Sequence, residues 1–401
     1  MNLQQITIQA FSTSSTNETY LLETEGRFFE IGHDAAELLT YLREHGDSDE
    51  SVGRYVDEHG GRPTKEEITA FMDSMDKKTA GNGNAGGSNK RMSFLYSKDF
   101  IPAAVVERYS TMFSRLFHPW VMAVATGLFA ALDAAYFLFF KDTRNHTPID
   151  IYIIIGMYLF LVTSSLIHEF GHASACRHYG APHGNIGLGL YLNLPVFYTD
   201  VSHIWKLSRR QRCVVNFGGV YFQMLLLIPL LSVAIATGSN LLKYMIVLMN
   251  LNFLITMNPF FKFDGYWMVT DMLGVANLRQ KGKEWTTYVW KKLRGKEPHT
   301  RPYLLSLPRW TGYSLMAYTV VVSLFFGFYF LYVIPMFFVR FYDTFPTRFR
   351  DVLADLSYHR RPEWNDMQQI CLQLMFLIFF TYMIYRMVRP LFKHIIAWKR
   401  Q

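Results

Sequence analysis

Residues 161–179 read LVTSSLIHEFGHASACRHY and place a His-Glu-x-x-His sequence near the end of an apolar run. His168 and His172 are four residues apart, so on an α-helix both imidazoles leave the same face and can reach one metal ion. Glu169 projects at a different angle. In zinc hydrolases a carboxylate at this position takes a proton from the attacking water, whose pKa the zinc lowers. The stretch therefore predicts two metal ligands and a general base on one helix.

The residues that precede the motif make a chance occurrence less plausible. From Ile151 to Thr163 the chain reads IYIIIGMYLFLVT, without a single charge, so the motif lies within or just beneath a segment that can cross a bilayer. Ionisable side chains are costly at that depth unless they are paired or bind a metal. A histidine pair with a purely structural role is therefore disfavoured, and we expect a zinc site.

Composition indicates a membrane protein with one small soluble domain. Of the 401 residues, 50% are hydrophobic and 16% aromatic, which exceeds what a water-soluble core needs. Only 18% are charged, yet the formal net charge is +8. The excess lies beside apolar segments, where it indicates topology and attraction to anionic lipid. The bilayer is thus an expected partner, and nucleic acid is not needed to explain the charge.

Apolar segments of about 20 residues, the length that a bilayer requires, predict about six transmembrane helices. They lie at 119–140, 151–176, 213–237, 241–261, 312–339 and 370–387. Lys and Arg gather before the first segment, between the second and third, after the fourth and after the last. These are alternate loops, so the N- and C-termini are both expected in the cytoplasm. The zinc motif then lies near the cytoplasmic end of the second span.

Residues 1–76 have the pattern of a small α+β domain that resembles a winged helix. Short alternating segments predict strands at 5–10, 19–23 and 27–31, and helical periodicity follows at 34–44, 49–58 and 64–75. Residues 77–94 include KKTAGNGNAGGSNK and are predicted to form a flexible linker. The membrane domain is then expected at 95–401, with its core at 119–275.

The segment YLLETEGRFFEIGHDAAELLTYL at 20–42 resembles PqqD-like domains, which recognise leader peptides in pathways of ribosomally made peptides. The resemblance implies that residues 1–76 bind a leader, and a purely structural winged helix is the alternative. The expected contact is the strand Arg27-Phe28-Phe29-Glu30-Ile31, because an edge strand can accept an extended peptide. Phe28 and Phe29 would then point to opposite faces, one to the core and one to a partner.

The segment NIGLGLYLNLPVFYTD at 185–200 is apolar but too short to cross the membrane. We expect a re-entrant hairpin or strand layer that packs within the protein, since bare backbone cannot face lipid. Its edge beside a zinc site would suit an extended substrate. A simple packing loop is the alternative.

Asp264 is the best candidate for the third zinc ligand, since zinc hydrolases commonly use three protein ligands. It lies in NPFFKFDG at 258–265, where Pro259 ends a helix and Gly265 permits a turn. The carboxylate is thereby placed at membrane depth. Competing candidates lie in less apolar stretches: Asp200, Asp271, His178 and His203.

HEFGH in one span, followed some ninety residues on by NPFFKFDG, resembles the site-2 protease family of intramembrane zinc metalloproteases. PVFYTDVSHIWKLSRRQR and FKFDGYWMVTDMLGVANL resemble its branch of peptide zinc metalloproteases associated with modified peptides and bacteriocins. The resemblance covers about residues 150–280 and implies that His168, His172 and Asp264 hold Zn²⁺. In the usual pattern an Asn-x-x-Pro assists the substrate or oxyanion, but here Asn258 and Pro259 are adjacent, so Asn258, Asn252 or Asn250 could serve.

The expected function is therefore intramembrane cleavage of a ribosomally synthesised precursor peptide at the cytoplasmic side, with leader removal during maturation or export. Glu169 would accept the proton of the attacking water and return it to the leaving amine. A bacterial cytoplasmic membrane and a peptide exporter as further partner are implied. Two alternatives remain: proteolysis of a membrane-anchored regulator, or a non-proteolytic export or immunity protein with a structural zinc, for which Glu169 would have no use.

Overall fold

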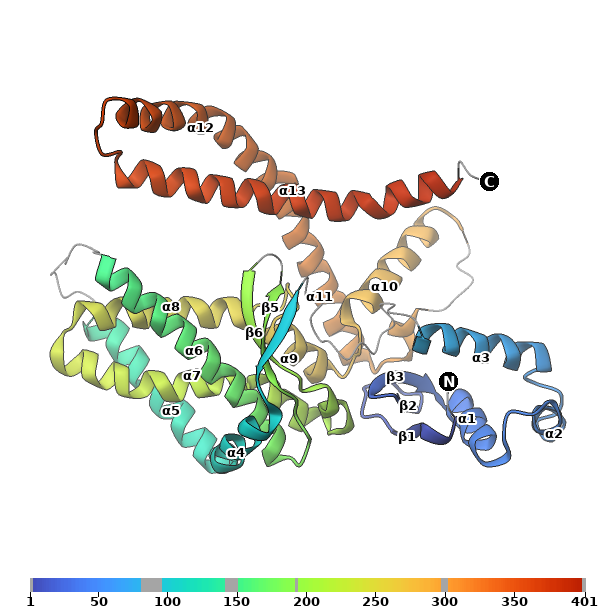
Figure 1. Ribbon diagram of the computed structural model, residues 1–401. Coiled ribbons are helices and arrows are strands. Elements are labelled where there is room, and N and C mark those ends of the chain that lie inside the picture. Colours follow the sequence, from blue (N-terminus) through green and yellow to red (C-terminus); the bar gives the residue numbers. More distant parts are fainter. Residues whose placement is uncertain (1–2, 81–95, 141–150, 192–193, 297–301, 399–401) are drawn as a thin grey trace. The chain divides into compact units, whose positions relative to one another are not determined.

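The computed structural model describes residues 3–80, 96–140, 151–191, 194–296 and 302–398 (Figure 1). The fold is mostly helical, with two small sheets. The chain divides into two compact units, Met1–Tyr191 with Pro195–Met316 and Leu192–Leu194 with Ala317–Gln401, each described here by itself. The first unit contains the amino-terminal domain and all the candidate site residues.

The amino-terminal domain begins with a three-stranded antiparallel sheet. After the short helix η1 (Leu3–Gln5) come β1 (Thr7–Ala10), β2 (Thr19–Thr24) and β3 (Arg27–Gly32), in the order β1-β2-β3. Glu25 and Gly26 both have positive φ and form the tight turn between β2 and β3. The strand order places β3 at an edge of this sheet within the described residues, which is the condition for the expected addition of an extended peptide.

Three helices cover one face of the sheet: α1 (His33–His45), α2 (Asp49–Glu58) and α3 (Lys65–Ala80). Thr64 and Glu67 form a reciprocal capping box at the start of α3, because each side chain accepts a hydrogen bond from the other residue's backbone N–H. The three strands and three helices agree with the sequence prediction. Helix α3 extends to Ala80, and the rest of the predicted linker lies outside the described residues.

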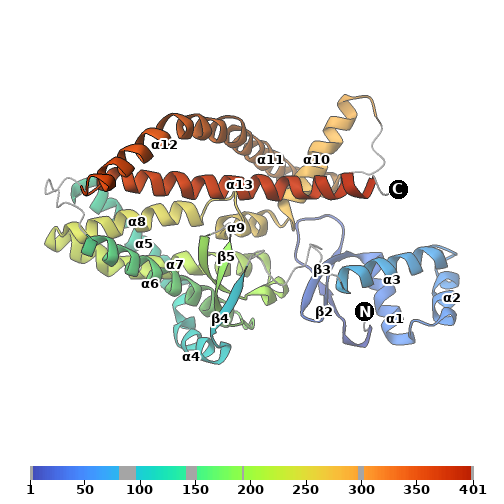
Figure 2. The same cartoon turned by 45° about the horizontal axis from the view of Figure 1, so that its top comes forward.

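Four helices form the core of the first unit: α5 (Pro119–Ala135), α6 (Ile151–His178), α7 (Arg209–Thr237) and α8 (Asn240–Thr256). They lie side by side in both views (Figures 1 and 2). Helix α4 (Ala103–Phe113) packs on α6, and shorter elements connect the set: η2 (Ser114–Phe117), the π-helical segment η3 (Tyr136–Phe140) and η4 (Ser202–Lys206).

A second sheet, ordered β4-β5-β6, combines one strand that precedes the His-Glu-x-x-His motif in sequence with two strands that follow it. It consists of β4 (Ser97–Ile101), β5 (Ile186–Tyr191) and β6 (Leu194–Thr199). The predicted strand layer at 185–200 is thus confirmed, and the alternative of a simple loop is wrong. Strand β6 has a partner on one side within this sheet.

Two helices complete the part of the first unit that carries the site, α9 (Asp264–Leu273) and α10 (Leu278–Leu293), followed by η5 (Tyr303–Ser306). Helix α11 (Arg309–Phe328) leads into the second unit, which contains the π-helical η6 (Tyr329–Val333), α12 (Ile334–Ser357) and α13 (Trp364–Trp398). Aromatic rings hold α12 to α13, with the Phe337 and Phe380 centroids 5.1 Å apart.

Five helical stretches in the described residues are long and apolar enough to cross a membrane: Pro119–Phe139, Tyr152–His178, Arg209–Thr237, Arg309–Ser357 and Trp364–Tyr385. The fourth predicted span, 241–261, corresponds to the shorter helix α8, which has 17 residues. It ends earlier than predicted because Asn258-Pro259 follows, and proline cannot continue a helix. The chain is thus compatible with a polytopic helical membrane protein.

Candidate metal centre

Three ligand atoms meet where the start of α9 reaches α6. Asp264 Oδ2 lies 2.9 Å from His168 Nε2 and 3.2 Å from His172 Nε2, and the two imidazole nitrogens are 3.1 Å apart. Asp264 is the first residue of α9, and the histidines occupy successive turns of α6. Among the described residues, these three form a group that could hold a metal ion. The fold thus brings together the three candidate ligands that the sequence singled out.

The donor set and its spacing fit Zn²⁺. Tetrahedral zinc with bonds near 2.0–2.1 Å places its ligand atoms about 3.3 Å apart. Asp264 Oδ2 is buried and, despite its two close neighbours, accepts no hydrogen bond of correct geometry in the described part of the chain. Burial acts to raise the pKa of Asp264, but the nearby His172 and His168 imidazoles lower it below its ordinary value. A carboxylate binds a metal in its ionised form, which this direction of the shift favours.

Helix α7 orients both imidazoles through their other ring nitrogens. His172 Nδ1 lies 2.7 Å from the carbonyl oxygen of Val215, and His168 Nδ1 lies 3.2 Å from Oε1 of Gln223. Both partners are acceptors, so each Nδ1 carries the proton and donates it. The lone pair of each Nε2 is then directed toward the shared position beside Asp264.

Gln223 is a functional candidate that sequence reasoning missed. Its side chain is almost fully buried, and its Nε2 donates to Oγ of Ser164, 2.9 Å away and one helical turn before His168. Asn252 Nδ2 lies 3.5 Å from the same Gln223 Oε1 that receives the His168 proton. The available signal was an uncharged polar residue within the apolar run of the third span, which is costly in a membrane unless it is paired.

The two asparagines proposed to assist catalysis have different surroundings. Asn252 joins the hydrogen-bond network behind His168 through Gln223. Asn258 instead accepts a hydrogen bond from the backbone N–H of Phe260, 2.7 Å away, in the turn after α8. That contact is local and stabilises the turn that leads to Asp264. The alternative Asn250 bonds to Asp133, 3.0 Å away.

Glycines permit the close approach of the elements that carry the ligands. A Cβ at Gly219 would lie 2.4 Å from the His168 ring, and one at Gly171 would lie 2.2 Å from the carbonyl oxygen of Gly218. A Cβ at Gly265 would lie 2.1 Å from the Met257 carbonyl oxygen. Helix α7 can therefore pack against the zinc motif, and α9 against the end of α8, only because these side chains are absent.

Glu169 lies on α6 directly after the first histidine and is 8% exposed. Its backbone carbonyl accepts a hydrogen bond from Thr199 Oγ1, 3.3 Å away, at the end of β6. This contact places the end of β6 beside the motif. The site therefore combines a buried carboxylate with the end of a strand.

The competing ligand candidates are engaged elsewhere. Asp200 accepts from Ser202, Asp271 pairs with Arg212, and His178 contacts the Ser114 carbonyl oxygen. His203 meets the edge of the Phe28 ring, with centroids 5.5 Å apart. None of them belongs to the ligand group formed by the described residues.

Phe28 and Phe29 lie on opposite faces of β3, as expected, but Phe28 is only 3% exposed and packs within this chain, so the expected contact of one ring with a partner is not available in the described residues. Phe29 and Ile31 lie in the core of the amino-terminal domain, whereas Phe28 packs with Phe11 and Leu21 against Trp205 and Ala276. Arg27 is half-buried at the start of the strand. Burial raises the pKa of Glu30, an effect that Lys281 partly offsets. Through Phe28, the sheet face opposite the three helices meets η4 and the segment after α9 of the same chain.

Comparison with curated proteins finds similarity to the Bacillus subtilis (strain 168) protein named "Putative peptide zinc metalloprotease protein YydH". The two are 26% identical over 137 residues, which is 33% of this chain and 54% of that protein. The match thus spans about half the length of the curated relative. No family model matches the chain, and no solved structure matches it.

Proposed function

We propose that this protein is a membrane zinc metallopeptidase that cleaves a ribosomally made precursor peptide at the cytoplasmic side of the bilayer. The observation that carries the proposal is the meeting of His168, His172 and Asp264 within hydrogen-bonding distance of one another. Similarity to a protein named as a peptide zinc metalloprotease supports the same chemistry.

When bound, zinc would supply Lewis acidity, which polarises the scissile carbonyl and lowers the pKa of water. Glu169 is the general base in this proposal: it accepts a proton from the attacking water and later donates it to the leaving amine. Gln223 and the Val215 carbonyl keep the two imidazoles in the orientation that ligation requires. Asp264, ionised and buried, completes the ligand set.

The peptide itself must reach the site in an extended form. Within the described residues β6 is the last strand of its sheet and ends beside Glu169, so an extended segment could add to it as a further strand. The leader portion is assigned to residues 1–76, whose edge strand β3 could accept a second extended segment. In this proposal the leader is recognised by residues 1–76, and the peptide is cleaved at a different place, beside Glu169.

The test is co-expression of the full chain with peptides encoded beside its gene, followed by mass spectrometry of the products. A new peptide terminus should appear with the wild-type chain and be absent with Glu169→Gln. Cleavage of a co-expressed membrane-anchored regulator, with no cleavage of any such peptide, would instead favour the regulatory protease. No Glu169-dependent product from either class would contradict the proposed activity.

A further inference from the structure

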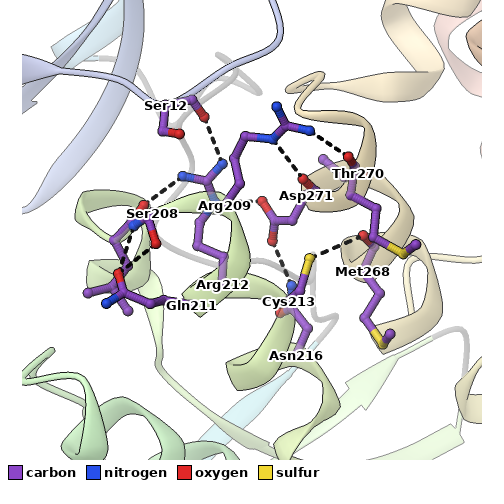
Figure 3. Close-up of polar contacts among 12 residues, drawn as sticks. Ser12, Ser208, Arg209, Gln211, Arg212, Cys213, Asn216, Met268, Thr270 and Asp271 are labelled. Atoms are coloured by element: carbon purple, nitrogen blue, oxygen red, sulfur yellow. Dashed lines mark hydrogen bonds and ion pairs between the residues drawn. The ribbon is translucent and has the colours of Figure 1, made fainter. Parts of the chain in front are cut away.

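Arg212 and Asp271 form a buried ion pair between the two helices that organise the metal centre. Arg212 Nε lies 2.6 Å from Asp271 Oδ1, and both residues are 2% exposed. Asn216, one turn further along α7, donates to the other carboxylate oxygen at 2.7 Å (Figure 3). Both oxygens of Asp271 are thus engaged by α7.

The contacts continue to the carboxyl end of α9. Arg209 donates to the backbone oxygen of Asp271 at 3.3 Å, and the Cys213 thiol lies 3.9 Å from the Met268 oxygen (Figure 3). Arg209 also donates to the backbone oxygen of Met272 at 2.6 Å. Helix α9 is therefore clamped to the first turns of α7 along much of its length.

These contacts between α7 and α9, called the α7–α9 clamp below, affect the position of Asp264, the third candidate ligand. Asp264 and Asp271 are seven residues apart on α9, about two turns, so they lie near the same face. The same α7 supplies Val215 and Gln223, the partners of both imidazoles. Fixing α9 against α7 thus fixes the position of Asp264 relative to His168 and His172.

The amino-terminal domain completes the surroundings of the ion pair. Arg212 Nη2 donates to the backbone oxygen of Ser12 at 3.0 Å, and its guanidinium carbon lies 5.2 Å from the Phe11 ring centroid. On the membrane-domain side, Trp205 lies 5.7 Å from the same carbon. Phe11 and Ser12 help to keep water from the guanidinium, and an ion pair is stronger in a dry, low-dielectric setting.

Further contacts hold the amino-terminal domain in this position. The backbone N–H groups of Ser14 and Thr16 donate to the oxygens of Gly274 and Ser306, each at 2.9 Å. Lys206 forms an ion pair with Glu23 at 2.7 Å. These contacts surround the apolar cluster of Phe11, Leu21 and Phe28 against Trp205 and Ala276.

We propose that Arg212 and Asp271 are positioning residues for Asp264, and that docking of the amino-terminal domain through Phe11 and Ser12 controls the affinity of the metal site. The proposal rests on the proposed function, since it takes the three ligands to hold zinc. When the domain separates, water reaches Arg212, the α7–α9 clamp weakens and Asp264 is held less firmly. A peptide that binds the amino-terminal domain and changes its docking would thereby change the zinc affinity of the metal centre.

The first test measures Zn²⁺ affinity of the purified full chain by competition with a chromophoric chelator. Arg212→Lys keeps the charge but loses the planar fork that binds Asp271 and the Ser12 oxygen together. Its affinity should fall about tenfold, as for other changes behind metal ligands. Arg210→Lys, at an exposed position on the same helix, is the matched control and should remain within about twofold of wild type.

The second test separates docking from folding by a charge swap. Glu23→Lys opposes Lys206 and should weaken both docking and zinc binding, whereas the Glu23→Lys/Lys206→Glu double variant should restore both. Glu25→Lys, in the exposed turn, is the control. Docking is read from disulfide formation in a Thr16→Cys/Ser306→Cys background. We expect about a fivefold loss of affinity on undocking, within the usual range for coupled sites.

The outcomes distinguish the two proposals. If wild-type protein binds no zinc, or binds it equally well after Asp264→Ala, the proposed metal site fails. If zinc binding depends on Asp264 but Arg212→Lys leaves it unchanged, the positioning role is wrong. If Glu23→Lys abolishes the cross-link without lowering zinc affinity, docking does not control the site.

Discussion

Glu169 and the three ligands have separable roles at the scale of single residues. Glu169→Gln removes the base but none of the ligands, so cleavage should fall by at least about a hundredfold, the usual contribution of a general base, while bound zinc is unchanged. His168→Ala and Asp264→Ala should lose zinc as well as cleavage. Metal content by atomic emission, measured beside the cleavage rate, checks this. A Glu169→Gln protein that still processes peptide at the wild-type rate would contradict the assignment.

Gln223 contributes through the orientation of His168. In Gln223→Leu the size of the side chain is nearly kept, but the acceptor for the His168 Nδ1 proton is lost. Zinc affinity should fall about tenfold. Gln280→Leu, on the exposed surface of α10, provides the control. Equal affinity in both variants would mean that the 3.2 Å contact has no part in holding the imidazole.

At the scale of elements, the packing of α7 against α6 depends on missing side chains. Gly219→Ala would place a methyl group 2.4 Å from the His168 ring, so the ring or the helix must shift. We expect zinc affinity to fall about tenfold or more, because a displaced imidazole no longer meets the other ligands. Gly127→Ala on α5 has open space around its new Cβ and should have no such effect. Chelator competition on both variants provides the comparison, and tight binding by Gly219→Ala would show that the packing tolerates a methyl group.

At the scale of the whole molecule, the distribution of Lys and Arg makes a prediction about topology. Reporter fusions at Gln401 and within residues 280–300 should be cytoplasmic, and fusions near Asn145 and Asp355 should be exported. Paired alkaline phosphatase and fluorescent protein fusions measure this. Helix α8 is shorter than the five candidate spans, so the number of spans depends on whether α8 crosses the membrane. If the amino terminus is cytoplasmic, an exported carboxyl terminus would mean that the number of spans is odd, which contradicts the predicted six.

The amino-terminal domain should distinguish peptides that carry a leader from those that lack one. Deleting residues 1–76 should slow cleavage of the full-length precursor about tenfold more than cleavage of a leaderless fragment with the same scissile bond, because the leader loses its local concentration effect. Both substrates use the same metal site, so any harm to zinc binding cancels in the ratio of the two rates. An unchanged ratio would leave the domain with a structural role alone.

Local sequence signals were sufficient for much of this protein. Four-residue spacing put His168 and His172 on one helical face, and an Asp-Gly after a proline indicated the third candidate ligand. Alternation predicted the strands of the amino-terminal sheet, and a short apolar segment indicated the strands at 185–200, but β4 was not predicted. Each signal depends on neighbours in the chain, which set backbone conformation and burial.

The partners of those ligands depend on contacts between distant segments. Gln223 behind His168, Gly219 against its ring, and Arg212 between Asp271 and Ser12 follow from the packing of α7 against α6, α9 and the amino-terminal sheet. Only the tertiary structure decides such contacts, because no local pattern records which helix face meets which neighbour.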